Sequence, residues 1–143
     1  MIISFCGHSD FFKTAEYEQK MFTAFDTLIG DQPVEFYLGG YGNFDFFAYD
    51  CGKRYQKTHS NVTLVFVTPY LDLPKGFSEC QYDEILYPPL EQVPRKFAIV
   101  HRNRFMMERA DVVIAYVEQH RGGAYQSYQY AKRKGKKIFS LAE

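Results

Sequence analysis

Short apolar runs alternate along the chain with stretches in which apolar residues recur every three or four positions. The runs end at glycine, proline or polar residues, as is typical of strands buried in a parallel sheet. They cover residues 2–6, 34–38, 62–67, 112–117 and 136–141. The intervening periodicity predicts amphipathic helices over about 17–28, 43–55, 94–109 and 122–134.

The interval between residues 68 and 94 fits neither pattern. Its prolines forbid a long regular element; they are Pro69, Pro74, Pro88, Pro89 and Pro94. One short strand at Glu84–Tyr87 is left open. Elsewhere the alternation of strand and helix implies right-handed crossovers. We therefore predict one Rossmann-like α/β domain over residues 1–143, with a mainly parallel sheet of about five strands and helices on both faces.

Charge and hydropathy narrow the function classes. Seventeen Lys and Arg balance seventeen Asp and Glu, so the formal net charge is zero. This balance argues against a nucleic-acid binder whose whole surface is basic, although a local basic pocket is compatible with it. No stretch approaches the ~20 apolar residues that cross a bilayer, and no basic leader opens the chain. We therefore predict a cytoplasmic protein with no membrane partner, and we disfavour nucleic acid as a partner.

The cysteines and aromatic residues add little chemistry. Cys6, Cys51 and Cys80 are odd in number and lack the paired spacing of a zinc site. We predict free buried thiols, no metal site and no cofactor. The 14 Phe and 12 Tyr suit either a well-filled core or an apolar dimer surface, so a homodimer is left open.

The strongest candidate site is the segment Gly39–Asp45, which joins a predicted strand to a helix. Glycine lets backbone N–H groups approach a ligand closely, and the N-terminus of a helix attracts an anion. A phosphate therefore suits this segment. The alternative is a tight turn in which Asn43 caps the helix and Asp45 complements its dipole. Because a carboxylate repels phosphate, a ribose hydroxyl is the better partner for Asp45.

Two further loops follow predicted strands. Gly7-His8-Ser9-Asp10 offers a hydroxyl, an imidazole and a carboxylate, which suit ligand contact, a helix cap or proton transfer by His8. Gly122-Gly123 repeats the arrangement of a strand, glycines and a helix. Ligands bind such sheets beyond the carboxyl ends of the strands. We therefore expect free amides on the loops at 39–42 and 122–123 to hold one anionic ligand together.

The run Arg102-Asn103-Arg104 lies on a predicted helix, where consecutive side chains point about 100° apart. Its members therefore cannot all face one ligand. Solvated charge is the simpler interpretation of this run, and one arginine at the site is the alternative.

Taken in order, these motifs resemble the SLOG superfamily of Rossmann-like proteins, which includes the DprA and Lonely Guy proteins. The matching segments are Gly7-His8-Ser9, Gly39–Asp45, Arg102–Met106, Ala110-Asp111 and Gly122-Gly123. The small YpsA-like bacterial proteins look most similar. The resemblance implies a nucleotide-derived ligand, with Gly39, Gly40 and Gly42 at its phosphate, Asp45 nearby, and Arg102 or Arg104 reaching the site.

The chain departs from the GGxGTxxE motif of the Lonely Guy enzymes. Asn43 stands where that motif has threonine, and Phe46 stands where it has the glutamate. We therefore favour a binding or sensor domain for a nucleotide or an ADP-ribose-like ligand. The alternative is a hydrolase or transferase acting on an N-glycosidic bond, with Asp45, Asp10 and His8 as catalytic candidates. The predicted ligand-binding set is Gly7, His8, Ser9, Gly39, Gly40, Gly42, Asn43, Asp45, Arg102, Arg104, Gly122 and Gly123.

Overall fold

The computed structural model describes residues 1–73, 75, 77 and 81–142. Within them, strands and helices alternate as the apolar pattern predicts. The strands are β1 (Ile2–Gly7), β2 (Val34–Leu38), β3 (Val62–Val67), β4 (Glu84–Leu86), β5 (Val112–Tyr116) and β6 (Lys137–Ser140). The helices are α1 (Ala15–Leu28), α2 (Asn43–Gln56), α3 (Ala98–Arg109) and α4 (Gly122–Arg133), and the 3-10 turn η2 (Arg95–Phe97) leads into α3.

The strands described form one sheet in the order β4-β3-β2-β1-β5-β6, and every neighbouring pair is parallel. The chain starts at the centre, moves outward through β2, β3 and β4, and then returns to add β5 beside β1. The loops that follow β1 and β5 therefore diverge from adjacent strands, which is where open α/β sheets bind ligands. The predicted α/β class is confirmed, with six strands where about five were expected.

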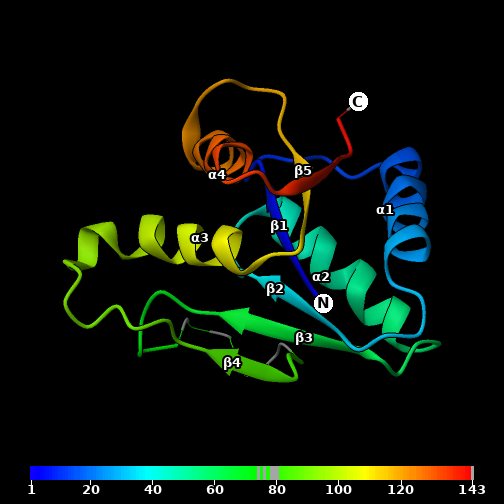
Figure 1. Cartoon of the computed structure of the whole chain (residues 1–143), viewed down its shortest axis with the longest axis horizontal. Coiled ribbons are helices and arrows are strands. Elements are labelled where there is room, and N and C mark those ends of the chain that lie inside the picture. Colours follow the sequence, from blue (N-terminus) through cyan, green and yellow to red (C-terminus); the bar gives the residue numbers. More distant parts are fainter. Residues whose placement is uncertain (74, 76, 78–80, 143) are drawn as a thin grey trace.

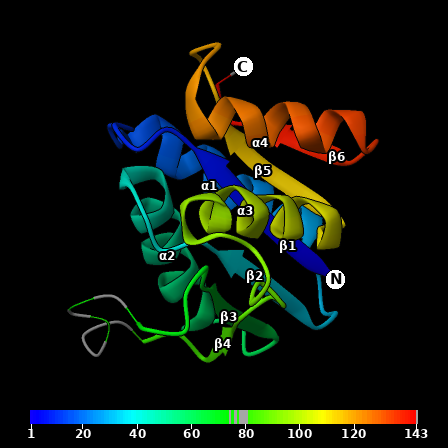
Figure 2. The same cartoon turned by 90° about the vertical axis from the view of Figure 1, so that its left-hand side faces the viewer.

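The helices cover the sheet in two pairs. Helices α1 and α2 pack together on one face, and α3 and α4 pack together on the other. Figure 2 shows the second pair in front of the strands. The first face has a core rich in phenylalanine, and the second is filled largely by methionine, valine and alanine.

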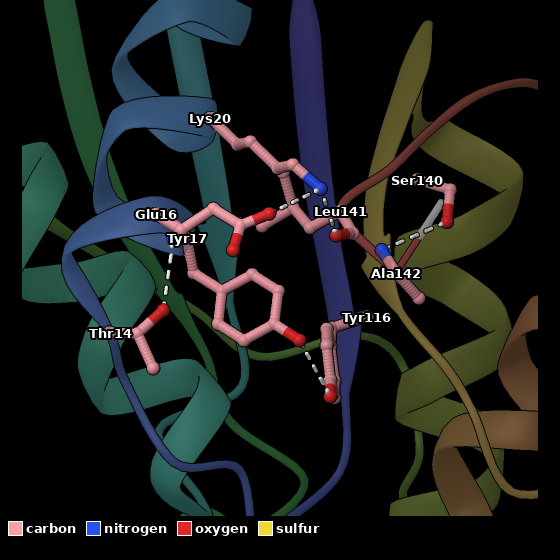
Figure 3. A network of polar contacts seen from close by, with 8 residues as sticks. All are labelled: Thr14, Glu16, Tyr17, Lys20, Tyr116, Ser140, Leu141 and Ala142. Carbon is pink, nitrogen blue, oxygen red and sulfur yellow. Dashed lines mark hydrogen bonds and ion pairs between the residues drawn. The ribbon is translucent and has the colours of Figure 1, made fainter.

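The start of α1 is attached to the end of β5 and to the residue that follows β6. Thr14 Oγ1 accepts a hydrogen bond from the Tyr17 amide at 3.2 Å, which caps the helix. The Tyr17 hydroxyl then lies 3.2 Å from that of Tyr116, the last residue of β5, and Lys20 Nζ donates to the Leu141 carbonyl at 3.4 Å (Figure 3). These contacts fix the loop after β1 relative to β5.

Ile114 tests the sheet core. Its side chain is fully buried at the centre of β5, so Ile114→Ala should lower the free energy of unfolding by about 2–5 kcal/mol. Ile85 on the edge strand β4 is 49% exposed and provides the control. Ile85→Ala should cost about 0.5 kcal/mol or less. Urea denaturation measures both, and equal losses would contradict the assigned burial.

Two sequence-based predictions fall partly outside the described residues. Cys6 and Cys51 are buried free thiols, as predicted, whereas Cys80 and Pro74 lie outside the ranges described. Within those ranges, none of the helices combines the length and the apolar character that crossing a bilayer requires.

Candidate ligand-binding pocket

A pocket of about 510 Å³ opens at the carboxyl edge of the sheet. Residues from all four sequence motifs line it. The end of β1 and the loop after it supply Gly7–Asp10, the loop after β2 supplies Gly39, and α2 supplies Asp45. Arg102 and Asn103 come from α3, and Gly122 and Gly123 come from the start of α4. Parallel strands end at one edge, so residues as far apart in the sequence as Gly7 and Gly123 meet there.

Four of the predicted ligand-binding residues are not part of the pocket wall. They are Gly40, Gly42, Asn43 and Arg104. Gly40 has φ +70°, and a Cβ atom there would lie 2.4 Å from Cε1 of the buried Phe66. Its lack of a side chain therefore lets the loop pack on β3. The Asn43 amide donates to the Ser9 carbonyl at 3.0 Å, which joins the loops that follow β1 and β2.

Asp45 turns back onto the glycine loop that precedes it. The Tyr41 amide donates to its Oδ2 atom at 3.4 Å, and the amides of Gly39 and Gly40 also interact with the carboxylate. Burial raises the pKa of Asp45 to about 6, while the Arg102 charge and the three amides act in the opposite direction. The sequence-based expectation of free amides in this loop is therefore wrong, because the protein's own carboxylate already engages them.

Arg102 ties three elements together beneath the pocket. It is 4% exposed, and its Nη1 atom donates to the carbonyls of Gly39 and Val67 at 2.9 and 2.8 Å. These carbonyls follow β2 and end β3, so the guanidinium links both strands to α3. Burial lowers the pKa of Arg102, and the nearby Asp45 charge opposes that effect. Arg102 therefore forms part of the pocket floor and balances the charge of Asp45.

His8 holds the loop between β5 and α4. Its Nε2 atom accepts hydrogen bonds from the amides of Glu118 and Gln119, at 2.9 and 3.1 Å. The imidazole is 7% exposed and meets the Tyr116 ring edge-on. Accepting two N–H groups requires an unprotonated Nε2, so the neutral ring carries its proton on Nδ1. This arrangement gives His8 a structural role at the pocket wall.

The start of α4 differs from the starts of α1 and α2. Thr14 caps α1, which has Glu16 and Glu18 in its first turn, and Asp45 occupies the first turn of α2. In α4, all of whose residues are described, no acidic residue lies in the first turn and no side chain caps it. Gly122 has φ +88°, a conformation that glycine adopts without strain, and both Gly122 and Gly123 line the pocket. A Cβ atom on Gly123 would meet nothing within 4 Å.

The uncapped turn leaves backbone N–H groups of α4 free for an anion, reinforced by the helix dipole. Arg121 is exposed beside them. The pocket therefore has two electrostatically distinct sides. The Asp45 side repels an anion, and the α4 side attracts one.

Cys6 also lines the pocket, and burial raises its pKa to about 12, which keeps the thiol protonated. Within the described residues, no cluster of three or more His, Cys, Asp and Glu side chains is placed to hold a metal ion.

Known structures share this architecture. DNA processing protein A from Helicobacter pylori matches with a TM-score of 0.68 at 19% identity, over 98% of this chain and 64% of that one. DNA processing protein A (DprA) from Streptococcus pneumoniae matches with a TM-score of 0.69 at 18% identity, over 96% of this chain and 49% of that one. The chain has the fold of the DprA proteins. The chain spans about two thirds of the length of the first neighbour and about half of the length of the second. No family model and no curated protein matches the sequence.

This likeness confirms the Rossmann-like α/β fold and corrects two sequence-based predictions. The H. pylori protein binds single-stranded DNA. The prediction of a nucleotide or ADP-ribose-like ligand is therefore wrong, together with its N-glycosidic alternative, and so is the prediction that nucleic acid is an unlikely partner. The closeness to YpsA-like proteins stays a prediction, since neither neighbour bears on it.

The net charge of zero concealed a strong segregation of charge along the chain. Residues 94–143 contain eleven Lys and Arg against four Asp and Glu, whereas residues 1–93 contain six against thirteen. The basic part of the chain includes α3 and α4, which lie together on one face of the sheet. Counting the charged residues of each segment separately would have revealed this asymmetry from the sequence. The asymmetry indicates a basic face on a protein whose net charge is zero.

Proposed function

We propose that the pocket binds the phosphodiester backbone of single-stranded nucleic acid, and single-stranded DNA is the first ligand to test. The observation that carries this proposal is the uncapped first turn of α4, which opens into the pocket within the basic part of the chain. The fold shared with a neighbour that binds single-stranded DNA supports it.

The two sides of the pocket give the strand an orientation. A phosphate bonds to free amides at the start of α4, and the exposed Arg121 adds a second positive group. The negative charge of Asp45 repels phosphate from the pocket floor. Its carboxylate accepts hydrogen bonds from base or sugar donors. Tyr41 lines the mouth and is 78% exposed, which gives a base a ring to stack on.

Two finer predictions belong to the same proposal. A cytoplasmic location suits free thiols such as Cys6 and Cys51, which persist in a reducing compartment. A relation to the YpsA-like proteins would add a family whose function is not assigned, so it leaves the proposed ligand unchanged.

Fluorescence anisotropy with labelled 20-nucleotide oligothymidylate tests the proposal. We expect binding that weakens linearly on a plot of log affinity against log salt, because phosphate contacts release counterions. A duplex of the same length should bind more weakly, because its bases are paired and cannot stack on Tyr41. AMP and ADP-ribose serve as competitors and should displace the oligonucleotide only at much higher concentration. Saturable binding of either small molecule with no binding of the oligonucleotide would overturn the proposal.

A further inference from the structure

A second hollow of about 450 Å³ lies between α3 and α4. Four residues belong to the walls of both hollows, namely Ile99, Asn103, Gly123 and Ser127. The two hollows therefore adjoin each other, and Gly123 at the start of α4 lies between them. Helices α3 and α4 lie side by side (Figures 1 and 2). The second hollow is lined by residues between Ile99 and Arg104 of α3 and between Gly123 and Arg133 of α4, so it forms a groove along the two helices.

The groove between α3 and α4 combines cations with aromatic rings. Arg104 and Arg133 are exposed, and their guanidinium carbons lie 5.7 and 5.8 Å from the centre of the Tyr130 ring. Tyr125 lies nearer the pocket, with its ring stacked on His120 at 5.5 Å. The Tyr130 hydroxyl donates to Glu108, whose carboxylate also lies 3.9 Å from Lys134 Nζ. Lys134 therefore balances the negative charge of Glu108, and the positive charges of Arg104 and Arg133 remain in the groove.

We propose that a single strand anchored in the pocket continues along this groove, with Arg104 and Arg133 at successive phosphates and Tyr125 beneath a base. The inference rests on the proposed function and extends it. Surfaces that bind single strands pair a positive groove with aromatic side chains in this way. The twelve residues of α4 span about 18 Å, which leaves room for several nucleotides beyond the one in the pocket.

The test compares two variants that each lose two positive charges. Arg104→Gln with Arg133→Gln removes the cations of the groove. Lys57→Gln with Lys137→Gln removes two exposed cations at the opposite edge of the sheet, where α2 ends and β6 begins. All four side chains are exposed, so both variants should keep the melting temperature of the wild type within a few degrees. Affinity is measured for oligothymidylates of 4, 8, 12 and 16 nucleotides at several salt concentrations.

The wild type should bind more tightly as the oligonucleotide lengthens. The groove variant should lose this gain, binding the 12-mer about tenfold more weakly at low salt and the 4-mer within about twofold of the wild type. Its salt slope for the 12-mer should fall by about 1.4, which is 0.7 for each lost phosphate contact. The Lys57 and Lys137 variant should match the wild type for every length.

The possible failures are distinct. If the wild type binds no oligonucleotide of any length, the proposed function fails and this inference falls with it. If the wild type binds all lengths and the groove variant keeps the full gain with length, only the path along α3 and α4 is wrong. Sedimentation velocity is run on the same samples. A wild-type dimer that the groove variant converts to a monomer would assign the groove to a second copy of the chain and overturn the inference.

Discussion

Replacing Gly123 by glutamate should reduce the affinity for single-stranded DNA about 100-fold without destabilising the protein. The new carboxylate would stand in the first turn of α4, on the pocket wall, where a Cβ atom has open space. Two like charges about 6 Å apart repel each other by about 3 kcal/mol at an effective dielectric constant near 20, which corresponds to about 100-fold in affinity. Anisotropy with the 20-nucleotide oligothymidylate measures the loss.

The same substitution should leave the fold intact or slightly stabilise it. An acidic side chain at a helix N-terminus adds about 0.3–1 kcal/mol, and glutamate is a better helix former than glycine. Gly123→Gln is the matched control, since it has the same shape without the charge and should bind within about threefold of the wild type. If the two variants bind equally well, the anion site does not lie at α4.

Replacing Arg102 by leucine should lower the free energy of unfolding by about 3–5 kcal/mol, because it removes one partner of a buried charge pair. The substitution leaves the carbonyls of Gly39 and Val67 without their donor, and leaves the Asp45 charge unbalanced. Arg104→Leu, two positions along the same helix, changes an exposed side chain and should cost about 0.5 kcal/mol or less. Chemical denaturation of both variants gives the comparison.

A second substitution separates the charge from the hydrogen bonds. Asp45→Asn removes the unbalanced charge, so it should recover part of the stability lost in Arg102→Leu. The rescue should grow as the pH rises. The folded pKa of Asp45 is raised to about 6 in the wild type, and loss of the Arg102 charge raises it further. Stability is therefore lost as the pH rises toward and through this pKa, so the cost of the Asp45 charge is smaller at pH 5 than at pH 8. Rescue of equal size at pH 5 and pH 8 would show that the Asp45 charge is not the cause.

The sequence predicted the fold well, because the apolar runs carry most of the information. The run at residues 62–67 matches β3 without a shift, and the runs at 2–6 and 112–117 match β1 and β5 within one residue. The short strand β4 was left open because its side chains are exposed or partly exposed, so burial gives it no pattern. The meeting of four motifs in one pocket also followed from the sequence, since parallel strands end at a common edge.

The directions of side chains within the site could not be predicted. Asp45 turns onto the amides of its own loop, and His8 accepts from amides 110 and 111 positions away. Gly40 meets Phe66 on β3, which no local pattern relates to the loop. Each of these contacts depends on how distant segments pack. The nucleic-acid prediction failed for another reason, because a net charge averages over faces that the fold keeps apart.

The most direct measurement is a titration of the ¹⁵N-labelled protein with a four-nucleotide oligothymidylate, followed by amide chemical shifts. We expect the amides of Gly122, Gly123 and Ala124 to shift together and to saturate at one equivalent of DNA. The amides of Gly39 and Gly40 should move little, because the Asp45 carboxylate already engages them. Saturable binding that leaves the start of α4 unchanged and shifts the glycine loop instead would contradict the account.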